Sequence, residues 1–352
     1  KRTTPFTDDE KSTNLNAAIT LFSGTYSQKQ VGIALYGLIG EWDMSQMTNM
    51  NNLFYQKSEF NEDINDWDVS NVTEMASMFS GANSFNKPLN KWNTSNVTSM
   101  SSMFNQANAF NQSINTNVQN AGEENEYVAW DVSNVTKMSF MFYQNRDFNQ
   151  PLSNWNTSKV VDMTRMFEAS SSYESAFNKN LSQNTVTDIY EVPYTAWDVS
   201  NVTTMSEMFK GCKNFNNGSV DEDGNPSSEA QNPLVWNPAK VENMTSLFYD
   251  CDIFNSEMKS EWTRDDDGNL NITTWDVSNV ENIRYIFDRA TAFNQESVRT
   301  WNMKHIFEEY TNPPVSVMFR STAFLDSASG NFIENNGYPS KYLWQLYEGN
   351  QE

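Results

Sequence analysis

An internal repeat constrains the fold of this sequence more than any other feature. The string Trp-Asp-Val-Ser-Asn-Val-Thr-x-Met begins at Trp67, Trp130 and Trp197, and close variants begin at Trp92 and Trp275. The base period is 25 residues, and a fixed period of this length is typical of proteins whose units stack on one another. Nine tryptophans begin such units: Trp42, Trp67, Trp92, Trp130, Trp155, Trp197, Trp236, Trp275 and Trp301.

The apolar positions inside one unit predict its secondary structure. Four of them follow the i, i+3, i+4, i+7 spacing of one helix face: Met75, Met78, Phe79 and Ala82. Residues 89–94 alternate apolar and polar side chains around Trp92, which predicts a short strand. A unit of one strand, one turn and one short helix cannot bury its own apolar face. We therefore expect about nine units, over residues 42–325, to stack into an α/β solenoid whose strands form one parallel sheet and whose Met, Phe and Trp columns form the core.

Four units exceed the base period and carry insertions of 13, 17, 14 and 14 residues. We place all four between the Phe-Asn pair of one unit and the next Trp, which predicts that they project from one edge. Asp267-Gly268 lies between two alternating arms, a strong cue for a β-hairpin, and residues 221–225 have similar turn chemistry. Loops added to one edge of a repeat array commonly form its binding or assembly face. The insertions lie near residues 112–129, 168–196, 217–235 and 256–274.

The two ends of a stack need a cover for their apolar surface. Residues 1–41 lack the repeat and contain acidic residues at 8–10, followed by apolar residues between Leu15 and Phe22. This pattern predicts an amphipathic helix within an N-terminal cap. Residues 326–352 include an aromatic segment, for which we expect either a C-terminal cap or docking into a neighbouring molecule.

The repeat resembles the BspA-like leucine-rich-repeat surface proteins, in particular the 25-residue-repeat branch abundant in mycoplasmas. The matching pattern is Trp-[Asp/Asn]-[Val/Thr]-Ser-Asn-Val-Thr-x-Met-x-x-Met-Phe-x-x-Ala-x-x-Phe-Asn, and it covers about residues 42–325. The resemblance implies a right-handed α/β solenoid on a cell surface or in secreted material, with adhesion as the usual role. The inserted units and the irregular unit at Trp301 depart from this pattern, so the resemblance carries over a class of function only.

Charge and motif content exclude several classes of protein. The chain has 23 Lys and Arg against 45 Asp and Glu, a formal charge of −22, which repels phosphate backbones and predicts no nucleic-acid binding. No apolar run approaches the roughly 18–20 residues that cross a bilayer, so we expect no transmembrane segment. We also expect no enzyme. The sequence lacks a phosphate-binding glycine loop, a nucleophile elbow and a Cys/His metal cluster, and its single histidine, His305, has no partner pattern.

Two acidic turns are candidate calcium sites. Asp221 and Asp223 in one turn, and Asp265 and Asp267 in the other, could offer oxygen ligands to Ca²⁺. No Glu lies six residues after the glycine of either turn, so the spacing differs from that of an EF-hand, and an acidic turn without metal is the alternative. We therefore expect no cofactor beyond weakly bound calcium.

The two cysteines occupy one column of the repeat. Cys212 and Cys251 each lie 15 residues after the Trp of their unit, where other units have Ala82, Ala107 and Ala290. The two residues should therefore be neighbours on adjacent units. Such neighbours can meet the Cα separation of about 4.4–6.8 Å that a disulfide requires, and two buried thiols in alanine-sized spaces are the alternative.

Asn-x-Ser/Thr sequons recur along the chain, several of them within the repeat itself. They predict a row of glycans if the protein is secreted by a eukaryote, whereas in a bacterium a ladder of hydrogen-bonding polar side chains would suffice to explain them. The glycosylation candidates are Asn71, Asn93, Asn96, Asn111, Asn134, Asn156, Asn180, Asn201, Asn217, Asn243 and Asn271.

Two functions from different classes fit these features. The first is a non-catalytic extracellular or cell-surface scaffold that mediates adhesion by binding a protein or glycan through its sheet face or hairpin edge. It predicts exposed aromatic anchors on the insertions, such as Tyr190, Tyr194 or Trp262. The second is a structural protomer of an extracellular filament or surface layer, in which copies associate through their ends and insertions.

Overall fold

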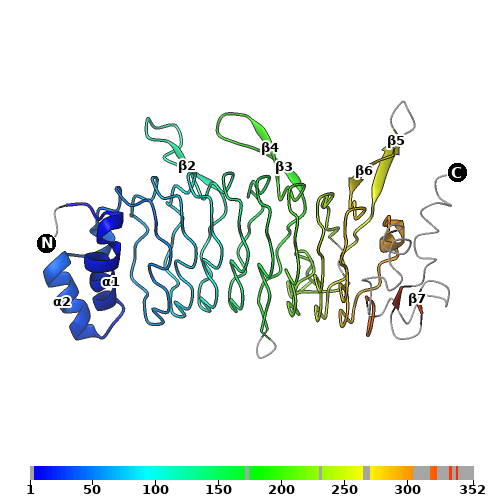
Figure 1. The fold of residues 1–352 in the computed structure, drawn as a ribbon, viewed down its shortest axis with the longest axis horizontal. Coiled ribbons are helices and arrows are strands. Elements are labelled where there is room, and N and C mark those ends of the chain that lie inside the picture. The colour runs from blue at the N-terminus through cyan, green and yellow to red at the C-terminus, as the bar shows by residue number, and fades with distance from the viewer. Residues whose placement is uncertain are drawn as a thin grey trace.

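The computed structural model describes residues 4–170, 174–229, 232–264, 270–303, 318–322, 333–334 and 338–339. Most of these residues form a row of stacked coils, one for each of the units that begin at Trp42 to Trp275, with a helical segment at the N-terminal end (Figure 1). His305 and most of the segment 326–352 lie outside the described residues. None of the described helices is both long and apolar enough to span a membrane.

Residues 4–41 fold against the first coil. The helical elements are η1 (Asp8–Glu10), η2 (Lys11–Leu15), α1 (Asn16–Phe22), α2 (Tyr26–Tyr36) and η3 (Ile39–Glu41). A capping box between Thr25 and Gln28 begins α2. Phe6 and Phe22 pack on Trp42, with ring centroids 5.1 and 5.3 Å apart. The N-terminal segment therefore buries the apolar end of the stack.

Parallel backbone pairing joins each coil to the next. The paired residues lie seven positions after each Trp, and they are Asn49, Glu74, Ser99, Lys137, Asp162, Thr204, Asn243 and Asn282. At the N-terminal end the pairing continues to Thr7, which pairs with Gln46. The carboxylate of Asp8 also accepts the backbone N–H groups of Thr48 and Asn49 at 3.1 Å. The cap therefore covers an open edge as well as apolar surface.

The helix predicted in each unit is wrong, because this part of every described coil is a series of tight turns. The residue ten positions after each Trp has a positive φ in eight coils, and the residue fourteen positions after it has one in seven. These residues are Asn52, Ser77, Ser102, Phe140, Arg165, Glu207, Ser246 and Tyr285, and then Gln56, Gly81, Gln106, Gln144, Gly211, Asp250 and Arg289. A left-handed residue at every fourth position interrupts a right-handed helix.

Hydrogen bonds between coils explain why the turns replace a helix. In the third coil, Ser102 N–H donates to Ser139 O at 2.9 Å and Gln106 N–H donates to Tyr143 O at 2.8 Å, both on the next coil. Between them, Asn105 N–H donates to Ser102 O within the coil at 3.1 Å. Alternate N–H groups thus point to the neighbouring coil, whereas a helix would direct all of them along its own axis. Turns with this alternation keep the apolar spacing that suggested a helix.

The strand predicted over residues 89–94 is also wrong, since no strand is assigned there. Side-chain hydrogen bonds stabilise the Trp column instead. The indole N–H of Trp92 donates to Ile64 O at 3.2 Å, and that of Trp155 donates to Ile114 O at 2.9 Å, in each case a carbonyl more than one repeat earlier in the chain. The same bond recurs at Trp67, Trp130, Trp197, Trp236, Trp275 and Trp301. The apolar–polar alternation around Trp92 therefore reflects a buried indole between the exposed Lys91 and the half-buried Asn93.

Stacked aromatic rings fill the core as the repeat predicts. Phe209 lies 5.5 Å from Phe167 and 5.6 Å from Phe248 between ring centroids, with planes within 5° of parallel. A second phenylalanine column runs beside the first, and Phe215 lies 4.1 Å from Phe209. All four side chains are buried. The Met, Phe and Trp columns therefore form one continuous core.

Three of the four insertions form β-hairpins on one edge of the stack (Figure 1). They are β1 (Asn117–Gln119) with β2 (Tyr127–Ala129), β3 (Asn184–Thr187) with β4 (Pro193–Ala196), and β5 (Glu261–Arg264) with β6 (Leu270–Thr274). Each hairpin returns to the stack through a Trp with positive φ: Trp130, Trp197 and Trp275. The remaining described elements are η4 (Glu296–Thr300), β7 (Ile333–Glu334) and β8 (Tyr338–Pro339).

One insertion departs from the predicted hairpin shape, and another departs in part from the predicted placement. The one near residues 217–235 lies before the buried Leu234, whereas the three hairpins follow the equivalent apolar residue, and its only assigned pairing within the described residues is a bridge between Val220 and Pro226. The one near residues 168–196 is divided, because four of its extra residues lie between Phe167 and Phe177 and only the remainder forms the hairpin. Phe177 is buried between the two inserted parts, and the chain therefore returns to the core at this residue before it forms the hairpin.

Candidate functional site

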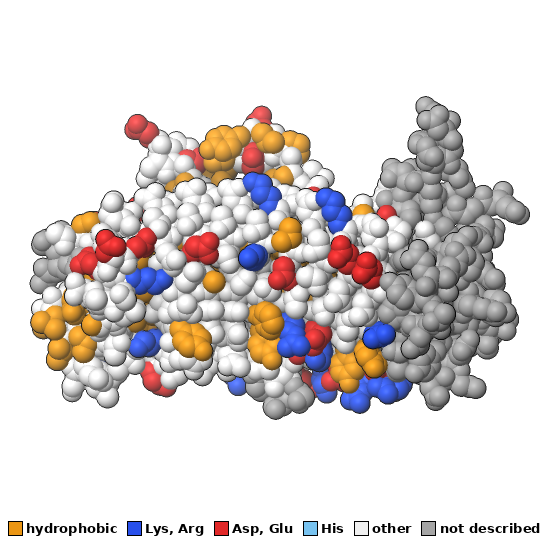
Figure 2. Space-filling view, viewed as in Figure 1, with side chains coloured by type: hydrophobic (Ala, Val, Ile, Leu, Met, Phe, Trp, Pro, Cys, Tyr) orange, Lys and Arg blue, Asp and Glu red, His pale blue; other side chains and the backbone are white. Residues whose placement is uncertain are grey.

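The two hairpins β1–β2 and β3–β4 face each other across a groove. Val118 and Val128 are cross-strand partners in the first hairpin, and Val186 and Tyr194 are partners in the second. All four residues line one cavity of about 540 Å³. Figure 2 shows hydrophobic side chains gathered on the hairpins above the stack. We call this cavity the hairpin groove.

The floor of the hairpin groove comes from the coil that separates the two hairpins. The units at Trp130 and Trp197 are each preceded by a hairpin, and the unit at Trp155 between them is not. Asn154 and Asn156, on either side of Trp155, therefore line the groove. The alternation of inserted and uninserted units is the sequence signal that could have located this groove.

Two carboxylates lie at the hairpin groove. Asp131 accepts the backbone N–H of Ser133 at 2.9 Å, and Asp188 accepts those of Tyr190 and Val192 at 2.9 and 2.8 Å. In each case one oxygen stabilises a turn. No ion pair with a described Lys or Arg is recorded for either carboxylate, and no Lys or Arg lines the groove.

Tyr194 connects the groove wall to the floor. Its hydroxyl donates to the backbone carbonyl of Asn154 at 2.6 Å. Burial raises the pKa of Tyr194 to about 12, and the negative charges of Asp131 and Asp188 act in the same direction. The phenol is therefore a neutral donor at physiological pH, and the charged groups that line the groove are both carboxylates.

The exposed aromatic anchor predicted at Tyr190 is present, since its side chain is 76% exposed at the hairpin turn. Val118 and Val192 are also exposed on the same two hairpins. Tyr194 is half-buried rather than exposed, and the side chain of Trp262 lies outside the described residues. Of the two predicted anchors whose side chains are described, Tyr190 is exposed and both line the hairpin groove.

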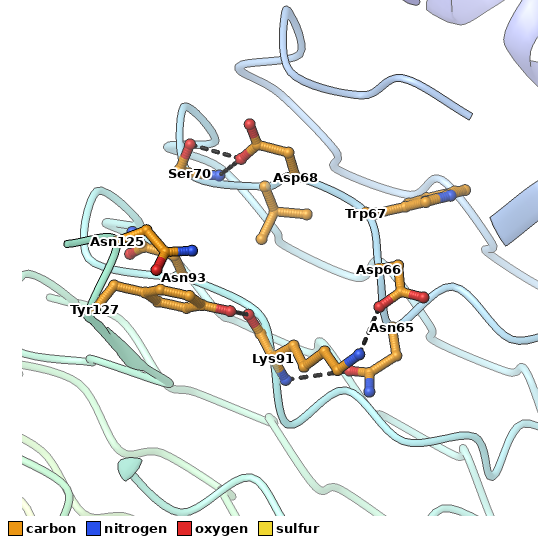
Figure 3. A pocket seen from close by; sticks show the side chains of 10 residues that line it. Asn65, Asp66, Trp67, Asp68, Ser70, Lys91, Asn93, Asn125 and Tyr127 are labelled. Atoms are coloured by element: carbon orange, nitrogen blue, oxygen red, sulfur yellow. Dashed lines mark hydrogen bonds and ion pairs between the residues drawn. The ribbon is translucent and has the colours of Figure 1, made fainter. Parts of the chain in front are cut away.

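A second cavity, of about 390 Å³, lies at the foot of β1–β2 (Figure 3). Lys91 there binds Asp66 through an ion pair of 2.7 Å, which raises the pKa of Lys91. The Tyr127 hydroxyl donates to Lys91 O at 2.6 Å, and Ser70 donates to the Asp68 carboxylate at the same distance. The ion pair of Asp66 distinguishes this cavity from the hairpin groove, whose carboxylates bond only to N–H groups of their own turns among the hydrogen bonds given above.

An ion-pair network that the sequence reasoning missed joins the fifth and sixth coils. Arg165 Nη2 lies 2.7 Å from Glu207 Oε1, and Lys210 also pairs with Glu207. The carboxylate of the buried Glu168 lies 3.3 Å from Arg165 and 3.4 Å from Lys210. Burial raises the pKa of Glu168, and the two cations oppose that rise. The sequence signal for this network is a pair of opposite charges at the same repeat position of successive units, such as Arg165 and Glu207. Their ion pair links neighbouring coils.

The two cysteines are free and buried in the structure. Adjacent backbone bonds, such as Gly211 N–H to Tyr249 O at 2.7 Å, place them on neighbouring coils as their spacing predicts. The thiols of Cys212 and Cys251 donate to the carbonyls of Phe167 and Phe209, each at 2.9 Å. Burial raises the pKa of both thiols strongly, so they lack the character of reactive cysteines.

The acidic turn at Asp221 uses its carboxylate internally. One oxygen accepts the N–H groups of Asp223 and Asn225 at 3.0 and 2.8 Å, and these bonds lower the pKa of Asp221. Among the described residues, no group of three or more His, Cys, Asp or Glu side chains could hold a metal ion. The other predicted calcium ligands, Asp265 and Asp267, lie outside the described residues.

Four of the sequon asparagines form a ladder of hydrogen bonds between coils. The Nδ2 group of Asn71 donates to Ser45 O on the preceding coil at 2.8 Å, and Asn96, Asn134 and Asn201 repeat this bond. Asn217 is a correction: its side chain is fully buried and bonds to Ser182 and Pro233, so it has no room for a glycan. The side chain of Asn271 lies outside the described residues, and glycosylation at the remaining sites stays a prediction.

Comparison with known proteins identifies the repeat. A family model described as "Mycoplasma protein of unknown function, DUF285" matches residues 20–129, 118–218, 186–267 and 258–332. These four matches together cover most of the chain, including every inserted unit. No curated protein and no solved structure matches the chain.

Proposed function

Because this chain belongs to the DUF285 family of mycoplasma proteins of unknown function, we propose its function from its geometry. The protein is a non-catalytic repeat scaffold that binds a partner, a protein or a glycan, through the hairpin groove. It acts outside the cell or on its surface, as the resemblance to BspA-like adhesion proteins and their solenoids implies. The wider fold assignment, a right-handed leucine-rich-repeat-like solenoid, is part of the same proposal.

The observation that carries this proposal is the apolar surface left open between two hairpins. Val118 and Tyr190 are exposed on the two hairpins. Most Val and aromatic side chains of the stack below them are buried. Exposed apolar surface next to polar groups commonly marks an interaction site, and tyrosine is enriched among the anchors of interfaces. The stack below is packed through a continuous core, so it would hold the two hairpins at a fixed separation.

We expect replacement of Tyr190 by serine to weaken partner binding by roughly ten- to thirty-fold, the effect of losing one interface anchor. The measurement is retention of the fluorescently labelled full chain on a panel of mammalian cells, extracellular-matrix proteins and immobilised glycans. The matched control is Tyr55→Ser, which removes a tyrosine that is also exposed (51%) but lies outside the groove. Equal retention of the wild-type chain and the Tyr190→Ser variant would reject the groove as the binding site.

A second candidate function, self-assembly through the ends, is favoured by the outer face of α2. Its exposed apolar residues on one side are Val31 and Leu35, and the exposed Leu38 lies two residues after the end of the helix. Figure 2 shows hydrophobic side chains at this end of the molecule. The sequence between Lys11 and Gly40 contains no Asp or Glu, although the whole chain has a charge of −22. A second copy could therefore approach α2 without the repulsion that opposes contact elsewhere.

Self-assembly predicts a concentration-dependent dimer that depends on this face. Sedimentation velocity of the full chain should show the dimer, and Leu35→Glu should shift its dissociation constant upward by at least ten-fold, because the change places a carboxylate in an apolar contact. Val192→Glu, on the exposed β3–β4 hairpin, is the control for added charge. A dissociation constant on the order of 100 µM is the weakest dimer of interest. A wild-type chain that stays monomeric at about this concentration would rule out assembly through α2.

A further inference from the structure

The chemistry of the hairpin groove indicates which part of a partner it accepts. Its walls combine apolar side chains, such as Val118 and Val186, with uncharged polar ones, and its charged lining groups are the carboxylates of Asp131 and Asp188. The cavity of about 540 Å³ is within the usual range for ligand sites. Any occupant must therefore combine apolar surface with a group that complements negative charge.

We infer that the hairpin groove binds a lysine or arginine side chain of a partner polypeptide, flanked by aliphatic residues. This inference rests on the proposed function and specifies its partner. The aliphatic stem of a basic side chain packs against Val118 and Val186, while its charged head reaches the carboxylates. One side chain thus complements both features of the groove.

Charge complementarity favours this occupant over a neutral saccharide. Both carboxylates line the same cavity as Tyr194, and both raise the pKa of its phenol. No recorded ion pair with a described cation neutralises either carboxylate, in contrast to Asp66, which binds Lys91 in the neighbouring cavity. A saccharide would leave these charges without a counter-charge. Tyr190 and Tyr194 line the same cavity, and aromatic rings add attraction for a cation.

The net charge of the chain acts in the same direction at longer range. A protein with a formal charge of −22 attracts a basic segment and repels an acidic one. Since the carboxylates of Asp131 and Asp188 lie at an open groove, added salt should screen their attraction. Binding of a basic peptide should therefore weaken as the salt concentration rises.

The test uses the full chain and three blocked peptides that differ at one residue, acetyl-Gly-Val-Lys-Val-Gly-amide and its Gln and Glu counterparts. We expect the Lys peptide to bind at least ten-fold more tightly than the Gln peptide by isothermal titration calorimetry, and the Glu peptide not to bind. Raising NaCl from 50 to 500 mM should remove most of that difference.

Two variants test the carboxylates without disturbing their turns. Asp131→Asn and Asp188→Asn should each weaken binding of the Lys peptide about three- to ten-fold, because each removes one negative charge from the groove. The turns should persist, since an amide oxygen can still accept the same N–H groups. Asn93 and Asn156 already make the equivalent turn bond in other coils, at 3.1 and 3.2 Å. Asp43→Asn is the matched control, since Asp43 accepts Ser45 N–H at 3.0 Å outside the groove, and we expect no change there.

The outcomes separate this inference from the proposed function. Equal binding of the Lys and Gln peptides, no binding of either, or no effect of both Asn variants would overturn the basic side chain as the ligand. In each of these cases, loss of retention in the Tyr190→Ser variant would still establish the groove as a partner site. Unchanged retention in that variant would instead reject the groove, and with it both proposals.

Discussion

Replacing Phe209 by alanine is expected to destabilise the protein by about 3–5 kcal/mol, the usual cost of removing a buried phenylalanine. Its side chain is fully buried and stacks between Phe167 and Phe248 of the two neighbouring coils. Coils in a stack are stabilised mainly by contact with their neighbours. A cavity in the middle of the Phe column should therefore uncouple the two halves, and unfolding should change from one transition to two.

Urea denaturation followed by tryptophan fluorescence and by circular dichroism measures this effect. The matched control is Phe54→Ala, in the same column of the first coil, where Phe79 at 5.2 Å is the neighbour on only one side. We expect that change to loosen the N-terminal end and leave the main transition in place. A single unshifted transition for Phe209→Ala would contradict the stacked core.

Substitutions at Gln106 are expected to invert the order of stability that a helix would give. Gln106 is exposed, has a φ of 55°, and donates its N–H to Tyr143 O on the next coil at 2.8 Å. A β-branched residue in this left-handed conformation costs on the order of 1–3 kcal/mol, whereas glycine adopts it freely. Gln106→Val should therefore be less stable than Gln106→Gly. At an exposed helix position, glycine would be the worse of the two.

Both Gln106 variants lose the same side chain, so their comparison isolates the backbone. Gly81 and Gly211 occupy the same position of their units, with φ values of 74° and 75°, which shows that glycine fits there. Gln106→Pro should be the most destabilising of the series, by more than about 3 kcal/mol, because it also removes the bond to the next coil. Chemical denaturation gives the free energy of unfolding of the three variants. A Gln106→Val variant more stable than Gln106→Gly would support a helix at this position instead.

The sequence by itself determined the period, the core columns and the approximate places of the insertions. Trp, Met and Phe recur at fixed positions because each unit must present the same apolar surface to its neighbours. The same spacing put Cys212 and Cys251 on adjacent coils, and it exposed Tyr190 on an insertion. These features depend only on which residues are apolar and how far apart they lie.

The backbone of each unit was decided by the tertiary structure. Met75, Met78 and Phe79 have the spacing of a helix face, and they have it equally in a series of turns with a left-handed residue at every fourth position. The choice depends on where the N–H groups find acceptors. In this fold the acceptors are carbonyls of the next coil, such as Ser101 O for Ser77 N–H at 2.8 Å, and a local pattern contains no information about them.

The hairpin groove also depended on the tertiary structure, although its parts were visible in the sequence. Val118 and Tyr194 are distant along the chain, and they line one cavity because a coil without an insertion separates their hairpins. The sequence gives the order of inserted and uninserted units. Only the stacking of the coils sets which faces of the two hairpins oppose each other and brings Asp131 and Asp188 to the same cavity.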